Sequence, residues 1–369
     1  MPQIPEIQPP APVPCPVPCA EDHTVIAKLS LLDRFLPLWI LLAMGAGLLL
    51  GRGFPWIQGA LDAVKLGQTS LPIALGLLLM MVPVLAKVRY EDLGQALRQR
   101  RLLPLCLLLV WGLGPLLMFC LAWLFLADQA ALRTGVVLIG LAPCIAMVLI
   151  WIDLADGDRE AAAVLVAINS LLQIFGYALL ADLYLKILPE WLGLPSQDVI
   201  FSTADIAQAV LIFLGIPLVV GYLIRRIGLN LKGRRWYVQR FLPRFSPWSL
   251  IGLLFTILVM FALQGEIITS TPLRVARVAM PLLIYFAVMW GLAFGLGRRS
   301  GLSYRQCATL SFTAAGNNFE LAIAVSVSVW GVTSDQALAG VIGPLIEVPV
   351  LVALVYLSLW LRSQFFKQA

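Results

Sequence analysis

The segment that decides the fold is residues 133–153, which read RTGVVLIGLAPCIAMVLIWID. Apart from its two ends it carries no charged side chain, and it is long enough to cross a bilayer as a helix, which takes about 20 mainly apolar residues. Pro143 interrupts this helix, because proline removes a backbone hydrogen bond and clashes with the preceding turn. The segment therefore predicts a membrane span that breaks between Gly140 and Pro143 and restarts with Cys144 in its first turn.

The rest of the chain has the same apolar character. Of its 369 residues, 60% are hydrophobic and only 12% are charged, whereas soluble globular proteins carry about 25% charged residues. This composition excludes an ordinary cytosolic enzyme and predicts an all-α polytopic membrane protein. We expect ten transmembrane helices, at about residues 34–51, 70–86, 102–127, 133–153, 160–185, 203–224, 246–264, 275–297, 306–330 and 337–361.

The basic residues predict how these spans are oriented. If the N-terminus lies inside, 20 of the 26 Lys and Arg residues fall in cytoplasmic segments. Cytoplasmic loops of membrane proteins carry such an excess of Lys and Arg. We therefore expect a multi-pass protein of the cell membrane with both termini in the cytoplasm. The same bias explains the net charge of +6 without a nucleic-acid partner.

Ten spans divide into five and five, and the sequence contains a weak internal repeat. Arg133 and Arg305 open the fourth and ninth spans, and the same offset places Cys144 opposite Gly316. Because five is an odd number, a second copy would enter the membrane from the other side. That arrangement is an inverted repeat, which is typical of transporters that bind substrate near the midplane.

Three regions follow from this division. Residues 1–30 form a Pro-rich, disordered cytoplasmic tail, residues 31–200 the first five-helix repeat, and residues 201–369 the second. The tail contains eight prolines and lacks the basic start and apolar core of a signal peptide.

The tail also holds the single histidine of the chain, His23, beside Cys15 and Cys19. The proline spacing prevents a helix that would align these three soft ligands. A solvated tail is therefore the favoured interpretation, and metal or metalloid capture is the alternative. The absence of histidine from the spans excludes a Ser-His-Asp triad or a His-based zinc site within them.

Of the cysteines in or beside apolar segments, Cys144 is the one placed at a predicted helix break. The positive end of a helix dipole favours thiolate there, so we hypothesise a reactive sulfur able to bind a metal or metalloid. The alternative is a small apolar core residue, which is our interpretation of Cys106, Cys120 and Cys307.

The ninth span contains a second predicted break. Gly316, Asn317 and Asn318 favour a turn over a helix, and Glu320 follows near the middle of the membrane. A charge there costs about 2.5–3.5 kcal/mol, so it marks function by default. We expect Glu320 to face a cavity and exchange protons. The alternative is a neutral acid that is hydrogen-bonded to the backbone.

Other polar groups in the spans have two interpretations each. Glu347 lies between two prolines and either shares the proton coupling or shapes the tenth helix. Asn169, Ser170 and Gln173 share one face of the fifth span, where they line the pathway or form interhelical hydrogen bonds. The acidic loop at residues 153–160 is expected to be solvated.

These residues also carry a resemblance to a known family. The motif GLAPCIAMVLIW at 140–151, followed by DLADGD at 153–158, closely resembles the signature of the arsenical-resistance arsenite permeases. These permeases belong to the bile/arsenite/riboflavin transporter superfamily. The resemblance runs from about residue 30 through Glu160, Asn169, Ser170, Gln173, GNNFELAIA at 316–324 and VIGPLIEVPV at 341–350.

The resemblance implies ten spans in inverted repeats, with the fourth and ninth helices broken and crossing. It implies export of As(III), and in some members Sb(III), in exchange for protons. Cys144 would be the essential thiol and Glu320 the essential acid, and no cofactor is expected. Ile152 departs from the family pattern, since many relatives carry Asn at that position.

The sequence thus predicts an arsenite/proton antiporter that confers arsenical resistance, with antimonite as a second candidate substrate. Cys144 is expected to ligate As(III), with the substrate site completed by Glu320 and, from both halves of the chain, by Asn317, Asn318, Asn169 and Ser170.

Three alternatives are weaker. A sodium-coupled organic-anion symporter would need oxygen ligands for sodium more than a thiol. An intramembrane enzyme with Cys144 as nucleophile would lack a histidine base in the spans. A passive channel is disfavoured by two opposed helix breaks.

Overall fold

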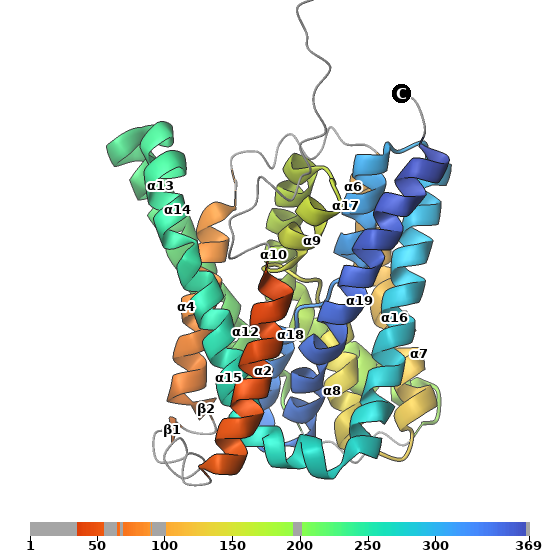
Figure 1. Ribbon diagram of the computed structural model, residues 1–369. Helices are drawn as coiled ribbons and strands as arrows, with labels where there is room; N and C mark the ends of the chain where they lie inside the picture. The colour runs from red at the N-terminus through yellow and green to blue at the C-terminus, as the bar shows by residue number, and fades with distance from the viewer. Residues whose placement is uncertain are drawn as a thin grey trace, which may run out of the picture.

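The computed structural model describes residues 35–54, 65–66, 69–88, 90, 101–194 and 201–366 (Figure 1). The proline-rich tail, with Cys15, Cys19 and His23, lies outside these residues. Within them the fold is helical except for one antiparallel pair of two-residue strands, β1 (Lys65–Leu66) and β2 (Thr69–Ser70).

Most of the described chain lies in helices, several of which contain short π-helical turns (η). In chain order they are α2 (Leu36–Gly53), α4 (Leu71–Lys87), α6 (Leu102–Leu107), η3 (Leu108–Leu113), α7 (Gly114–Leu126), α8 (Ala130–Gly140), α9 (Val148–Leu154), α10 (Arg159–Asp182), η4 (Leu183–Ile187), α11 (Leu188–Trp191), α12 (Thr203–Val210), η5 (Leu211–Gly215), α13 (Ile216–Trp236), η6 (Tyr237–Phe241), α14 (Leu242–Phe245), α15 (Pro247–Ser270), α16 (Pro272–Arg299), α17 (Tyr304–Ala315), α18 (Phe319–Trp330) and α19 (Asp335–Phe365).

Five helical stretches of the described chain are long and apolar enough to cross a membrane, and shorter apolar helices accompany them. The five are Leu102–Leu126, Arg159–Trp191, Thr203–Gly265, Pro272–Arg299 and Asp335–Phe365. The third contains a turn at Gly233, whose φ of 78° is not helical, so it folds back on itself. The predicted all-helical, polytopic membrane architecture is confirmed.

The helices form two packed groups. In one, α15 packs along α2 and α4, and α13 also packs on α4; in the other, α16 packs against α7, α17 and α19, and α8 against α19. Figure 1 shows the first group at the left and the second at the right. Helix α12 reaches from the first group to contact α10 and α18.

Small residues allow the closest of these contacts, between α2 and α15. A Cβ atom added at Gly47 would lie 2.5 Å from the Leu258 carbonyl oxygen, and one added at Gly51 would clash with the Ala262 carbonyl. Glycines four residues apart allow two helix backbones to approach this closely. Any side chain at either position would separate the two helices.

Two segments that the sequence treats as single spans are each divided into two helices. Helix α8 ends at Gly140 and α9 begins at Val148, whereas α17 ends at Ala315 and α18 begins at Phe319. The non-helical residues between them form the centre of the candidate site.

Candidate functional site at the junction of two interrupted helices

The two interruptions meet in space. Pro143 and Asn317 form an isolated antiparallel β-bridge, and the Cys144 N–H donates a hydrogen bond to the Gly316 carbonyl over 2.9 Å. Pro143 fits this bridge because it has no N–H to satisfy. We call this meeting point the junction; it comprises residues 142–144 and 316–318.

Asn318 joins the two sides of the junction through its backbone and its side chain. Its N–H donates to the Ala142 carbonyl over 2.8 Å, and its Oδ1 caps α18 by accepting from the Leu321 N–H over 3.0 Å. Its Nδ2 donates to Gln173 Oε1 over 2.8 Å, and Gln173 Nε2 donates to the Pro143 carbonyl, also over 2.8 Å. Gln173 on α10 therefore holds both interruptions together.

The sequence predicted that Cys144 lies in the first turn of a helix, and the structure shows that it does not. Pro143 and the bridge keep residues 141–147 non-helical, so α9 begins only at Val148. The buried thiol, only 1% exposed, therefore lies four residues ahead of α9, outside the first turn of that helix.

Two carboxyl groups accompany this thiol. Glu320 is 5% exposed and Glu347 is fully buried, and none of their four carboxyl oxygens has a hydrogen-bond partner. Both act electrostatically on Cys144 and Glu320 acts on Glu347. A Cβ atom added at Gly316 would lie 3.2 Å from the Cys144 Cβ and 3.9 Å from Glu347 Oε1. The unpaired Glu320 oxygens favour the proton-exchange interpretation over that of an acid hydrogen-bonded to backbone, and the role of Glu320 stays a prediction.

The polar side chains of α10 have different roles. Asn169 Oδ1 accepts from the Trp111 indole over 3.1 Å, an interhelical hydrogen bond of the kind that one of the two interpretations of this face predicted. The Ser170 hydroxyl donates to the Val166 carbonyl of its own helix over 2.7 Å. The Nδ2 donors of Asn169 and Asn317 are buried without a partner, so both stay available to a ligand.

Within the described chain, no three His, Cys, Asp or Glu side chains are grouped so as to hold a metal ion. In and around the junction lie one buried thiol, two buried acids and two unpaired amide donors.

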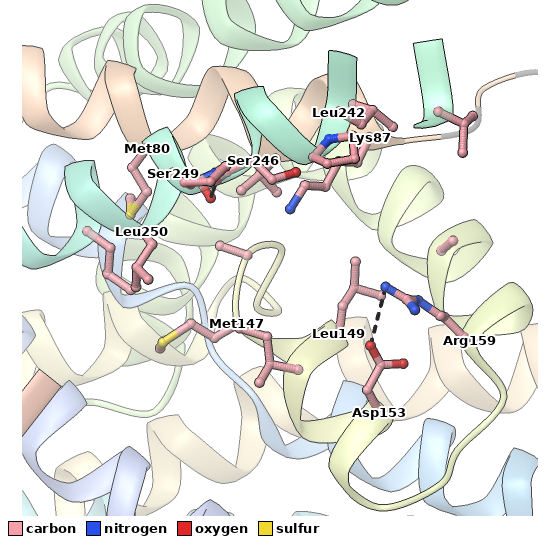
Figure 2. A pocket seen from close by; sticks show the side chains of 18 of the residues that line it. Met80, Lys87, Met147, Leu149, Asp153, Arg159, Leu242, Ser246, Ser249 and Leu250 are labelled. Atoms are coloured by element: carbon pink, nitrogen blue, oxygen red, sulfur yellow. Dashed lines mark hydrogen bonds and ion pairs between the residues drawn. The ribbon is translucent and has the colours of Figure 1, made fainter. Parts of the chain in front are cut away.

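A large cavity, which we call the vestibule, opens beside the junction (Figure 2). Its volume is about 810 Å³, and its lining includes Lys87, Asp153, Arg159 and Leu242. Figure 2 shows the ion pair between Arg159 and Asp153, whose atoms lie 3.5 Å apart. Lys87 ends α4, Asp153 lies near the end of α9, and Arg159 and Leu242 begin α10 and α14, all at one end of the bundle (Figure 1).

The vestibule stops short of the junction. Ala146 and Met147 line it, whereas Cys144 and Glu320 do not. Glu320 therefore does not line the vestibule, and its exposure to a cavity stays a prediction.

The sequence predicted a solvated loop at residues 153–160, but several of its residues bind other helices. Asp158 caps α10 by accepting from the Glu160 and Ala161 N–H groups, and its own N–H donates to Thr309 Oγ1 over 2.8 Å. Asp156 pairs with Arg362 over 2.8 Å. The loop thereby ties α9 and α10 to α17 and α19.

The opposite end of the bundle is closed by polar contacts, and we call it the closed end. Gln264, beyond the vestibule-lining part of α15, donates from Nε2 to the Val332 carbonyl over 2.6 Å. Arg277 on α16 forms a two-pronged ion pair with Asp128 in the turn between α7 and α8.

The chain is similar to known transporters. Residues 74–271, more than half of the chain, match the profile of a family described as the Sodium Bile acid symporter family. Fold and family together define the class of protein, a membrane transporter.

Curated relatives give the narrower assignment. The chain is 55% identical to the arsenical-resistance protein Acr3 of Corynebacterium glutamicum over 340 residues, which cover 92% of each protein. It is 30% identical to an Acr3 of Alkaliphilus metalliredigens, over 88% of this chain and 92% of that protein. An uncharacterized transporter of Synechocystis sp. is 34% identical, over 89% and 88%. The chain belongs to the Acr3 arsenical-resistance family.

This membership confirms the family resemblance that the motifs indicated. It also confirms the prediction of a transporter in place of an enzyme.

Proposed function

We propose that the chain is an arsenite efflux permease, which exchanges As(III) for protons and thereby confers arsenical resistance, with antimonite as a second substrate. Two relatives named arsenical-resistance protein support this assignment. The observation that carries it is the buried Cys144 thiol beside two buried carboxyl groups without partners. A soft metalloid prefers a sulfur ligand, and proton coupling needs a titratable group next to that ligand.

The binding step is a ligand exchange. In As(OH)3 the Cys144 sulfur displaces one hydroxyl group: an S–As bond forms, an As–O bond breaks, and the thiol proton leaves with the hydroxyl group as water. Arsenic stays As(III) throughout. Glu320 is the group that takes the proton from sulfur and passes it to the departing oxygen. The Nδ2 donors of Asn169 and Asn317, unpaired in the fold, bind the remaining arsenite hydroxyl groups. Asn318 and Ser170 complete the lining of the substrate site.

Release reverses this exchange. In release the As–S bond breaks, water bonds to arsenic, and the proton that this water gives up passes through Glu320 to the Cys144 sulfur. A proton from outside binds the Glu320 carboxylate of the emptied protein and leaves to the cytoplasm after the return, which couples export to proton entry. Glu347 acts as a second proton carrier, because its oxygens are also unpaired and it interacts with Glu320.

The proposed frame has ten membrane spans in two inverted five-helix repeats, residues 31–200 and 201–369. The fourth and ninth spans are the interrupted helices, which cross at the junction. Both termini lie in the cytoplasm, the protein resides in the cell membrane, and the vestibule opens to the cytoplasm. The bias of Lys and Arg and the presence of one interruption in each half support this frame. Rocking of one helix group against the other would provide alternating access.

A second candidate is sodium-coupled symport of an organic anion. It is favoured by the name of the matching family and by the four unpaired carboxyl oxygens, since hard cations prefer oxygen ligands. It leaves the Cys144 thiol at the junction without a role, and we therefore rank it second.

Everted membrane vesicles from a host without its own arsenite exporters test the proposal. Arsenite should accumulate under an imposed pH gradient and stop in Cys144→Ala, because the ligating sulfur is gone. Cys106→Ala is the matched control, since Cys106 is equally buried but remote from the junction. Persistent accumulation in Cys144→Ala would contradict the proposal. Dependence on a sodium gradient in place of a pH gradient would support the second candidate.

A further inference from the structure

The region from residue 225 to 245 has a charge pattern that transport chemistry does not explain. We call it the basic hairpin; it comprises the end of α13, η6 and α14. It contains seven Lys or Arg residues and no Asp or Glu. Figure 1 shows it at the outer edge of the bundle, at the same end as the C-terminus.

The hairpin is a packed element. Gly233 provides its turn, with a φ of 78° that side chains disfavour. A Cβ atom at Gly228 would lie 2.6 Å from the Tyr237 ring, so the two arms are in direct contact. The Tyr237 hydroxyl donates to the Ala86 carbonyl of α4 over 3.0 Å. These contacts fix the hairpin on the first helix group.

Aromatic rings form a small groove on this hairpin. The ring centroids of Trp236 and Phe241 lie 5.6 Å apart, and those of Phe241 and Phe245 lie 5.0 Å apart, both pairs stacked. The groove has a volume of about 160 Å³, and Arg240 and Arg244 complete its lining. It therefore combines an apolar floor with a cationic rim.

Within the described part of the chain, no acidic side chain neutralises the cationic rim. Arg240 and Arg244 are exposed, and no ion pair of the described residues includes either of them. Elsewhere in the fold, Arg277 and Arg362 each pair with an aspartate. The groove thus presents two uncompensated positive charges above stacked rings.

We propose that this groove binds the phosphate headgroup of an anionic phospholipid in the adjoining membrane leaflet. Arg240 and Arg244 would contact the phosphate, since basic pockets at a membrane surface select anionic headgroups. The aromatic rings would lie against the glycerol and upper acyl chains, where such rings concentrate at interfaces.

A lipid bound at this position would also affect the vestibule. Val238, Leu242 and Pro243 of the same hairpin line the vestibule. A bound headgroup therefore holds one wall of the vestibule at the membrane surface while the other helix group moves. The inference does not depend on what the protein transports.

Lipid binding to the purified full-length protein tests this inference. Phosphatidylglycerol, but not phosphatidylcholine, should raise the thermal unfolding temperature and stay bound in native mass spectrometry. Arg240→Gln/Arg244→Gln should lose this response, with about fivefold weaker binding per arginine, the size expected for one basic residue near an anionic surface. Arg298→Gln/Arg299→Gln is the matched control, because it removes two exposed arginines that line no described groove, and it should respond as wild type.

Three outcomes would overturn the inference: an equal loss in both double variants, equal protection by phosphatidylcholine, or equal protection by inorganic phosphate. The two variants are compared only if their unfolding temperatures without added lipid match that of the wild type. If Arg240→Gln/Arg244→Gln fails this check, Trp236→Leu replaces it, and its retention of full lipid binding would also count against the groove.

Discussion

The acids at the closed end and beside the junction have opposite surroundings. At the closed end, the exposed Asp128 carboxylate is paired with Arg277. Beside the junction, the buried Glu320 and Glu347 keep every carboxyl oxygen unpaired. An unpaired buried polar group costs folding free energy, so a fold retains it where a ligand or proton uses it. The comparison distinguishes polar groups that stabilise the fold from polar groups that are available for ligand binding and proton transfer.

Replacement of a junction acid should have the largest effect. Glu320→Gln keeps the shape but cannot exchange a proton, so we expect pH-driven arsenite transport to fall about 100-fold, as when a proton-transfer group is lost. The thermal unfolding temperature should stay near that of the wild type, because the carboxyl oxygens make no hydrogen bonds. Transport in everted vesicles and thermal unfolding in detergent measure the two quantities. Unchanged transport would remove Glu320 from proton coupling, and Glu347→Gln in the same assay decides whether that acid couples or only shapes α19.

The next effect concerns the link across the junction. Gln173→Leu removes two hydrogen bonds and leaves the Asn318 amide unpaired, so the free energy of unfolding should fall by about 1–3 kcal/mol. Transport should also fall, because Cys144 and Glu320 lose their fixed relation. Tyr177→Phe is the control: one turn along α10, it removes a single bond to the Leu138 carbonyl and should leave transport intact. Equal transport rates in the two variants would show that Gln173 does not position Cys144 and Glu320.

A smaller effect is expected at the closed end. Gln264→Leu removes one hydrogen bond, worth about 1 kcal/mol. The equilibrium between conformations that are closed and open at this end should therefore shift about fivefold toward the open one. The rate at which a membrane-impermeant thiol reagent modifies Cys144 from that side should rise accordingly, measured against Cys144→Ala as background. Thr256→Val, which removes a bond within α15 itself, is the control. A slower reaction in Gln264→Leu would show that this contact does not close the protein.

The smallest effect should come from the ion pair on the surface. The hydrogen bond from Arg277 holds the pKa of Asp128 below its ordinary value. The folded state therefore gains stability from this pair at neutral pH, and loses it as the pH falls through the lowered pKa. In Arg277→Gln the unfolding temperature should drop slightly at neutral pH and depend less on acid than that of the wild type. Because exposed pairs contribute little, a drop as large as that of Gln173→Leu would contradict this ranking.

Local chemistry made part of the site predictable from sequence. Pro143 and the Gly-Asn-Asn stretch at 316–318 disfavour a helix wherever they stand, and the helices end beside both. Charge content and apolar run length were sufficient for the membrane class, because lipid permits few backbone structures other than helices.

The remainder depends on contacts between distant residues. The repeat offset places Cys144 opposite Gly316, but nothing in the sequence indicates that Pro143 and Asn317 form a β-bridge, which keeps Cys144 out of the helix. Gln173 was placed on the correct face, but its two partners lie on other helices. The loop at 153–160 looked solvated because Thr309 and Arg362, which bind it, come more than a hundred residues later.

The β-bridge between Pro143 and Asn317 limits the insertions and deletions that this protein can tolerate. Each strand of the bridge is a single residue, so an insertion or deletion in either interrupted helix would shift the thiol relative to the acids by a whole residue. Substitutions in the flanking helices are free of that limit, provided that they stay apolar. Lineages of such proteins should therefore keep the lengths of both interruptions constant while their outer surfaces diverge.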